Sequence, residues 1–333
     1  MNAEEYLDNT GRDDVLGGGA RRIPITTPEG EFHVWTKRIG NNPTAKLLLL
    51  HGGPAATHEY FEACDSFLPA ANIEYYYYDQ LGSAYSDQPD DPDLWQLDRF
   101  VDEVEQVRIA LGLDAGNFFL LGHSWGGILA TEYALRYEEH LKGLVISNMM
   151  MSIPAYNEYA RTVLMPAMDQ EVLAEIKQLE AAGDTETARY MELLNDHYLQ
   201  HVLRLPVEEW PDSVNRAFAH INRSIYVPMQ GPSELGASGI LASWDRTDAL
   251  ESINVPTLVI GATHDTMDPV HMEMVAGRIP HGRFLLCRNG SHMAMYDDQV
   301  TYFRGLIDFI IDIDHWSSSR SGSNPLPDRH RGF

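Results

Sequence analysis

Residues 118–137, FFLLGHSWGGILATEYALRY, constrain the fold of this chain more than any other stretch. The first residues are apolar and aromatic, as in a fully buried strand, and the last are apolar at helical spacing. Between them lies Gly122-His123-Ser124-Trp125-Gly126-Gly127, where glycines on both sides of the serine permit a sharp reversal. The stretch therefore predicts a strand, a tight turn and a helix, with Ser124 exposed at the tip in strained geometry.

Strand-like and helical stretches alternate along most of the chain. Residues 22–27 and 32–38, separated by Pro28-Glu29-Gly30, predict an antiparallel hairpin. Further strands are predicted from short apolar runs at residues 46–50, 73–78, 117–121, 141–147, 256–260 and 283–286. Such alternation is typical of an α/β fold with a mostly parallel, doubly wound sheet covered on both faces.

The alternation is interrupted once, between residues 150 and 244, where the sequence is helical and irregular. We interpret this block as a helical cap over the carboxyl edge of the sheet, where open α/β sheets bind ligands. Residues 21–149 and 245–314 form the predicted core. Residues 1–20 are polar and glycine-rich and predict a flexible lead-in, and residues 315–333 are rich in Ser, Pro and Arg and predict a disordered tail.

Composition narrows the class of partner. The formal net charge of −25 over 333 residues makes nucleic acid and anionic membranes poor partners and would attract a cationic substrate. No run of 18 apolar residues occurs, and the amino terminus has no basic region followed by an apolar one, so we expect a cytoplasmic protein. Cys64 and Cys287 lack metal-ligand spacing and are expected to be reduced.

Two further residues complete a possible site for acyl transfer by Ser124. This chemistry requires a base within hydrogen-bond reach of the serine and a carboxylate that orients the base. Asp265 follows the predicted strand that ends at residue 260, and His292 follows the last short strand. The chain order Ser124, Asp265, His292 is that of an α/β-hydrolase triad.

A glycine turn supplies the expected oxyanion hole. The buried run at residues 47–50 ends in His51-Gly52-Gly53-Pro54, which would bring the N–H of Gly53 close to a substrate. The second donor would be the N–H of Trp125, the residue after the nucleophile. We also expect Gly52 to contact substrate and the Trp125 ring to form one wall of the acyl pocket.

These motifs resemble those of the proline iminopeptidase family, serine aminopeptidases of α/β-hydrolase fold with a helical cap. The resemblance runs from about Arg22 to Asp312 and includes the motifs at residues 51–54 and 122–127, together with Asp79-Gln80 followed by Gly82. Gly231-Pro232-Ser233-Glu234 and Trp244-Asp245 are similar to the end of the cap in the subgroup that includes the tricorn-interacting aminopeptidase. There a glutamate holds the free amino terminus of the substrate, and Glu234 matches it.

One position departs from that subgroup. Its members carry a second acid beside the catalytic aspartate, where this chain has Thr266. One carboxylate would then hold the ammonium group where two are expected, unless Asp268 or another cap residue takes the place of the second acid.

The resemblance implies hydrolysis of the amide bond after an amino-terminal residue, with proline preferred, without a metal or organic cofactor. The expected partner is a small peptide or amino-acid amide with a free amino terminus. Two alternatives stay open: an amidase or small-molecule esterase with the same triad, and a homologue that binds a ligand without turnover. Haloalkane dehalogenases and epoxide hydrolases are disfavoured because their elbow carries aspartate.

Overall fold

The centre of the structure is an eight-stranded sheet in the order β1-β2-β4-β3-β5-β6-β7-β8. The structure is a computed structural model in which residues 19–318 are described. β1 pairs with β2 and β2 with β4 in antiparallel register, and all the other pairs are parallel, as the sequence predicts. The strands are β1 Ala20–Thr27, β2 Gly30–Ile39, β3 Lys46–Leu50, β4 Glu74–Asp79, β5 Phe118–His123, β6 Gly143–Ser147, β7 Thr257–Ala262 and β8 Gly282–Cys287.

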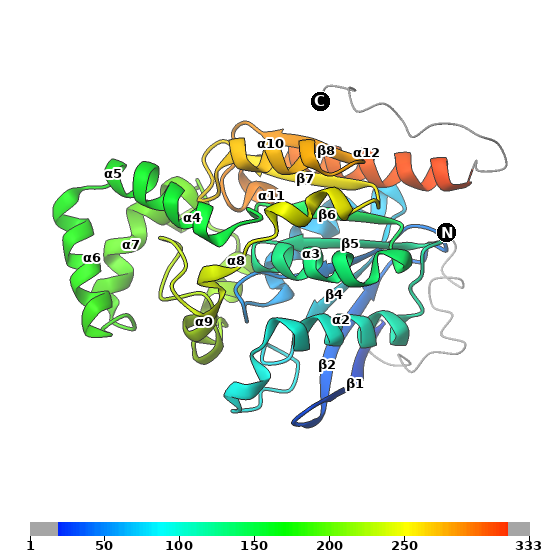
Figure 1. Cartoon of the computed structure of the whole chain (residues 1–333), viewed down its shortest axis with the longest axis horizontal. Coiled ribbons are helices and arrows are strands. Elements are labelled where there is room, and N and C mark those ends of the chain that lie inside the picture. Colours follow the sequence, from blue (N-terminus) through cyan, green and yellow to red (C-terminus); the bar gives the residue numbers. More distant parts are fainter. Residues whose placement is uncertain (1–18, 319–333) are drawn as a thin grey trace.

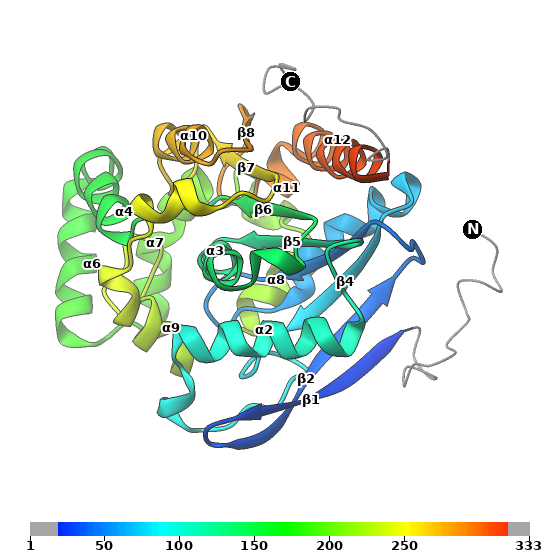
Figure 2. The same ribbon diagram turned by 45° about the vertical axis from the view of Figure 1, so that its right-hand side comes forward.

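Helices cover both faces of this sheet (Figures 1 and 2). The α-helices are α2 Leu97–Leu111, α3 Trp125–Tyr137, α4 Ile153–Tyr159, α5 Met165–Ala167, α6 Gln170–Ala182, α7 Ala188–His201, α8 Asp212–Ala219, α9 Arg223–Met229, α10 Pro269–Arg278, α11 Ala294–Asp297 and α12 Gln299–Ser318. A π-helical segment, η5 (Ala160–Leu164), joins α4 to α5, and the longest 3-10 segment is η1 (His58–Ser66).

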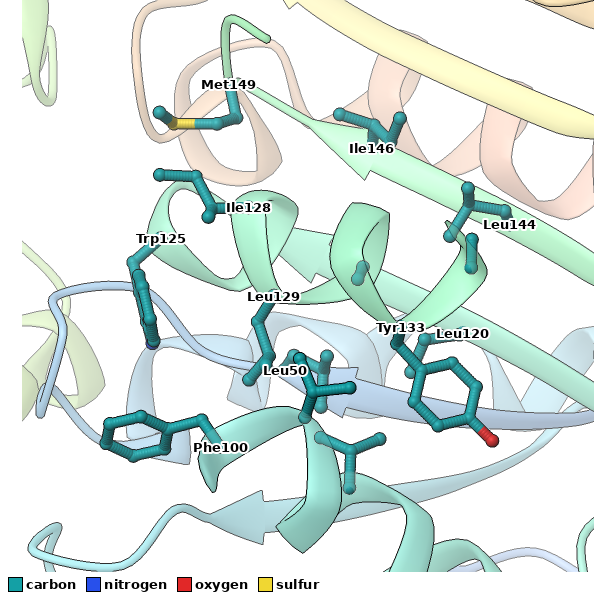
Figure 3. Close-up of a cluster of buried hydrophobic side chains, with 14 of the residues drawn as sticks. Leu50, Phe100, Leu120, Trp125, Ile128, Leu129, Tyr133, Leu144, Ile146 and Met149 are labelled. Carbon is teal, nitrogen blue, oxygen red and sulfur yellow. The ribbon is translucent and has the colours of Figure 1, made fainter. Parts of the chain in front are cut away.

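Alternate residues of each strand belong to two separate hydrophobic cores, because successive side chains of a strand point to opposite faces of the sheet. Leu48, Leu50 and Leu120 pack with α2, α3 and α10 in one cluster. Leu47, Leu49, Phe119 and their neighbours pack with η1, α8, α11 and α12 in the other. Figure 3 shows part of the first cluster, between α2, α3 and the sheet. The central strands are buried on both faces, which explains their continuous apolar sequence.

The block between β6 and β7 contains helices α4 to α9, and α4 to α7 lie to one side of the sheet (Figure 1, left). Side chains of α6 and α7 form a small core of their own with Leu235. Asp169 caps the start of α6, where its side chain accepts from the N–H groups of Glu171 and Val172, and Thr187 caps the start of α7. The predicted limits of the cap, residues 150 and 244, lie in the segments between β6 and α4 and between η7 (Ile240–Ser243) and η8 (Thr247–Ser252).

Backbone hydrogen bonds fasten this block to loops at the carboxyl ends of the strands. Asn222 N–H donates to the carbonyl of Ala55, after β3, at 2.9 Å. After β8, the N–H of His292 donates to the carbonyl of His201 and that of Met293 to the carbonyl of Val202, both at 2.9 Å. The helical block therefore lies against the edge of the sheet where the predicted site residues are found.

Both predicted chain ends need a small correction. β1 begins at Ala20, the last residue assigned to the lead-in, because Ala20 pairs with Lys37. α12 continues to Ser318, four residues beyond the predicted limit of the core. Its last turns are anchored by Asp314, which accepts a hydrogen bond of 2.6 Å from Lys142 Nζ. The rest of the predicted lead-in and tail, residues 1–18 and 319–333, lies outside the described residues. Within residues 19–318, no helix is long and apolar enough to cross a membrane.

Candidate active site

Ser124 stands at the turn between β5 and α3, with φ 56° and ψ −127°. This backbone conformation is strained for a residue with a side chain. The turn closes only because Gly122 and Gly126 lack side chains. A Cβ on Gly122 would lie 1.9 Å from the carbonyl oxygen of Gly126, and one on Gly126 would lie 2.1 Å from that of Leu50. The predicted strand, turn and helix are thus present. The prediction that Ser124 is exposed was wrong, because the residue is buried and faces an internal cavity instead.

Asp265 and His292 form a buried pair. His292 Nδ1 lies 2.8 Å from Asp265 Oδ1, and both side chains are almost fully shielded from solvent. Asp265 also accepts hydrogen bonds from Met267 N–H at 3.1 Å and from Asn148 Nδ2 at 2.7 Å. These donors fix the carboxylate, so that it can hold the His292 ring with Nδ1 protonated and Nε2 free to take a proton.

The His292 pKa is raised above its ordinary value. Burial alone lowers the pKa, but the charge of Asp265 and its hydrogen bond, together with the charge of Glu234, outweigh this effect. His123, whose ring lies 4.9 Å from that of His292 and is tilted by 51°, differs, because burial and the neighbouring His292 lower the pKa of His123 to about 3. His292 is therefore the ring suited to exchange protons near neutral pH.

Ser124 and His292 line the same cavity, which connects the serine with the buried pair. Within the described residues there is no hydrogen bond between Ser124 Oγ and His292 Nε2. Catalytic hydrogen bonds are often long in a site without substrate and shorten when it binds. The structure thus brings all three predicted residues together, with the Asp265–His292 link already formed.

The predicted oxyanion hole lies beside Ser124. A Cβ on Gly52 would lie 2.9 Å from Ser124 Cβ, so the glycine turn packs directly against the serine. Gly52 N–H donates to Tyr60 Oη at 2.6 Å, whereas the N–H of Gly53 has no partner in the described part of the chain. Trp125 is the first residue of α3, so no helical carbonyl lies one turn before it to accept its N–H. Gly53 and Trp125 can therefore both offer N–H donors next to Ser124.

Tyr60 and His123 connect this glycine turn to the loop of His292. His123 Nε2–H donates to the carbonyl of His292 at 2.8 Å, so Nδ1 accepts from Tyr60 Oη at 3.1 Å. This chain of hydrogen bonds crosses the site beneath Ser124, and it fixes the oxyanion turn relative to the predicted base.

The cavity has a volume of about 400 Å³. Glu234 lines it, and Oε1 of Glu234 accepts a hydrogen bond of 2.6 Å from Tyr226 Oη. The Glu234 carbonyl accepts from Tyr156 Oη at 2.9 Å. Apolar side chains form much of the remaining wall: Ala56, Met191, Val202, Ala217, Phe218, Ile221 and Met293.

The Trp125 ring does not have the predicted position. Among the described residues, those that line the cavity do not include Trp125. Its indole Nε1–H donates to Gln80 Oε1 at 2.9 Å, and its ring packs edge-on against Phe100 at 5.5 Å (Figure 3). The indole turns into the core because its polar N–H is satisfied there. Trp125 thus contributes a backbone donor to the site but no wall of the acyl pocket.

Thr266 and Asp268 do not supply a second carboxylate to the cavity. Thr266 is buried and donates through Oγ1 to Asp265 Oδ1 at 3.3 Å. Asp268 caps α10 by accepting from Val270 N–H at 2.9 Å. Besides Glu234, the carboxylate that lines the cavity among the described residues is Glu186, whose side chain is 77% exposed.

Comparisons with known proteins agree with this fold. Residues 46–299 match the family model described as alpha/beta hydrolase fold. A proline iminopeptidase of Flavobacterium johnsoniae is 57% identical over 293 residues, which cover 88% of this chain and 98% of that protein. The chain belongs to the proline iminopeptidase family. Among solved structures, the proline iminopeptidase of Mycobacterium smegmatis is 29% identical with a TM-score of 0.75, and VinJ is 29% identical with a TM-score of 0.81. Each comparison covers 88% of this chain and 99% of the solved one.

Three residues of this proline iminopeptidase family member were not predicted as site residues: Asn148, Tyr226 and Arg223. Asn148 follows β6 directly, and a polar residue at the carboxyl end of a buried strand could have indicated it. Tyr226 and Arg223 lie on the short helix α9 in the cap, where the sequence shows no motif.

Proposed function

We propose that this protein hydrolyses the amide bond after an amino-terminal residue, with proline preferred, through an acyl-enzyme on Ser124. One observation carries the proposal: a carboxylate, Glu234, lines the same cavity as Ser124 and His292. A carboxylate there can pair with the charged amino terminus of a substrate whose first carbonyl lies at the serine. The relative that is 57% identical is a proline iminopeptidase, which supports the same activity.

In the acylation step, Ser124 Oγ attacks the carbonyl carbon of the amino-terminal residue while His292 Nε2 takes the Oγ proton. The oxyanion accepts hydrogen bonds from the N–H groups of Gly53 and Trp125. His292 then gives its proton to the leaving nitrogen, the C–N bond breaks, and the acyl group stays on Ser124. Asp265 holds the imidazolium and its tautomer throughout.

In the deacylation step, water attacks the ester on Ser124 with His292 again as base, and the free amino acid leaves. Glu234 pairs with the imino or ammonium group in both steps, with Tyr226 holding one of its oxygens at 2.6 Å. The apolar wall suits a proline ring or another small apolar side chain, because burying such a group is favourable.

A second candidate is an amino-acid amidase or small esterase that uses the same triad. Thr266 favours it, because it stands where the resemblance implies a second acid and binds Asp265 instead. Glu234 then holds the amino terminus without a neighbouring carboxylate at residue 266, which would relax the requirement for a charged substrate.

A panel of anilides separates the two functions. Proline, alanine and phenylalanine anilides, each with a free and an acetylated amino terminus, would be assayed for kcat/KM. An aminopeptidase hydrolyses the free forms and rejects the acetylated ones, with proline first. Equal kcat/KM for free and acetylated forms would favour the amidase or esterase. A wild-type protein inactive on the whole panel would argue against the aminopeptidase and the amidase.

A further inference from the structure

Arg223 carries a charge into the cavity that the proposed mechanism does not use. Among the described residues lining the cavity, it is the one lysine or arginine. Its Nη2 donates to the carbonyl of Thr185 at 3.3 Å. Its Nε is shielded from solvent and has no hydrogen-bond partner, since the nearest carboxylate oxygen, Glu186 Oε1, lies 3.9 Å away. Burying an unpaired guanidinium N–H is costly, so a bound anion would satisfy a donor that is now unmet.

Arg223 lies at the outer part of the cavity. Its neighbours there include Glu186, with a side chain 77% exposed, and Met191, which is 46% exposed. Ser124 and His292, by contrast, are buried. Arg223 and Tyr226 are one turn apart on α9 and so share a face of that helix. The cavity therefore has, near its opening, a cation with one unmet N–H donor, and the Tyr226–Glu234 pair further along the same helix face.

We propose that Arg223 binds the carboxyl-terminal carboxylate of a short peptide, making free di- and tripeptides the preferred substrate class. This inference rests on the proposed function, in which Glu234 binds the amino terminus of the same peptide. Guanidinium and carboxylate match in shape and can form two parallel hydrogen bonds. An explicit cation is needed here, because the net charge of −25 otherwise repels an anionic group from the protein.

Glu186 pairs only loosely with this cation. At 3.9 Å it is too far from Nε to form a hydrogen bond, and its exposed carboxylate is well solvated. The Arg223 side chain is 30% exposed, so a peptide carboxylate can approach its outer N–H groups and reach the shielded Nε–H once the Glu186 carboxylate moves aside, without breaking a strong existing bond. Longer peptides and carboxamides lack a carboxylate at this distance and lose the contact.

The test compares peptides that differ in one charge. kcat/KM would be measured for Pro-Ala and Pro-Ala-Ala, each as the free acid and as the carboxamide, and for prolyl anilide. The wild type should prefer the acid by at least roughly tenfold in one of the two pairs. In Arg223→Gln this preference should disappear through a loss on the acid, while kcat/KM for the carboxamides and the anilide stays within about threefold.

Arg189→Gln is the matched control. Arg189 lies on α7, is about half exposed, and pairs with Glu175 and Glu192, so its loss changes net charge equally without touching the cavity. It should leave the acid-to-amide ratio unchanged. Arg223→Lys should retain part of the preference, since it keeps the charge but not the fork of donors.

Two results would overturn the inference. One is equal kcat/KM of the wild type for acids and carboxamides at both lengths. The other is an equal loss by Arg223→Gln on acids, carboxamides and anilide, which would make Arg223 a structural residue of the cap. Failure of the proposed function gives a different result, since the wild type would then not hydrolyse prolyl anilide at all.

Discussion

Tyr226 Oη donates a hydrogen bond of 2.6 Å to Oε1 of Glu234, inside the cavity that Ser124 also lines. One carboxylate oxygen is thus held by the cap itself. A tyrosine donor fixes the direction of the carboxylate without neutralising its charge. The full negative charge stays available for a substrate ammonium group.

Removing the charge of Glu234 should lower kcat/KM for substrates with a charged amino terminus. We expect Glu234→Gln to lower kcat/KM for a free aminoacyl anilide by at least roughly thirtyfold, because losing one partner of a buried charge pair costs about 2 to 5 kcal/mol. A neutral ester should be nearly unaffected. Glu175→Gln, an exposed carboxylate of α6, is the control. Equal losses on both substrates would instead give Glu234 a structural role and favour the esterase.

The charge of Glu234 should also affect the pH dependence of kcat/KM. His292 must be neutral to act as base, and its pKa is raised, so kcat/KM on a neutral ester should rise with pH through a midpoint above about 6.5. Burial lowers the pKa of His292, but the charges of Asp265 and Glu234 raise it. Glu234→Gln removes one raising charge and should shift the midpoint to lower pH. A rate that stays flat between about pH 5 and pH 8 would exclude His292 as the base.

The nucleophile can be tested directly. Ser124→Ala should fold with an unchanged thermal midpoint and lose kcat on the order of 10⁶-fold, as related triads do. A fluorophosphonate should label the wild type and not the variant. Ser243→Ala, which makes the same substitution at an exposed serine, is the control and should keep wild-type activity. Retention of more than about a tenth of the activity by Ser124→Ala would remove the mechanism.

Asn148 is expected to act as a positioning residue through Asp265. It has φ 52°, so Asn148→Gly removes the side chain while keeping a backbone that glycine adopts without strain. Losing a hydrogen bond to a charged group should cost about 1.5 to 3 kcal/mol, or roughly 10- to 150-fold in kcat. The acid limb of the pH profile should shift as well. A changed thermal midpoint with unchanged kcat and pH profile would make Asn148 merely structural.

Two glycines on helix or strand ends should respond oppositely to an added methyl group. Gly122→Ala places a Cβ 1.9 Å from a carbonyl oxygen and should destabilise the fold by about 3 kcal/mol or more. Gly277→Ala, on α10, meets no atom within 4 Å and should stabilise the helix by about 0.5 to 1 kcal/mol. Denaturant unfolding of both variants measures the contrast, and a stable Gly122→Ala protein would contradict the geometry of the elbow.

The sheet and the Ser124 turn were predictable because local patterns determine them. Buried strands require continuous apolar residues. The turn at Ser124 requires glycine at the positions where a Cβ would lie within about 2 Å of a carbonyl oxygen. Asp265 and His292 could be found because each follows a strand end, and parallel strands bring those ends to one edge.

Other features depend on tertiary partners that no local pattern reveals. The Trp125 indole turns away from the cavity because Gln80, from the loop after β4, accepts its N–H. Arg223 and Tyr226 lie on a seven-residue helix whose place over the cavity depends on the packing of the whole cap. The end of α12 was missed because its last turns are held by Lys142, which is distant in sequence.

The hydrogen bonds from the His292 loop to the carbonyls of His201 and Val202 limit how such caps can diverge. Every residue type has a backbone carbonyl, so substitutions in α7 leave the two acceptors for the His292 loop in place. Deletion or a change of length at the end of α7 would withdraw those acceptors. Exchange of a cap between relatives should therefore succeed only when the graft preserves the length of the chain at this junction, whatever its sequence.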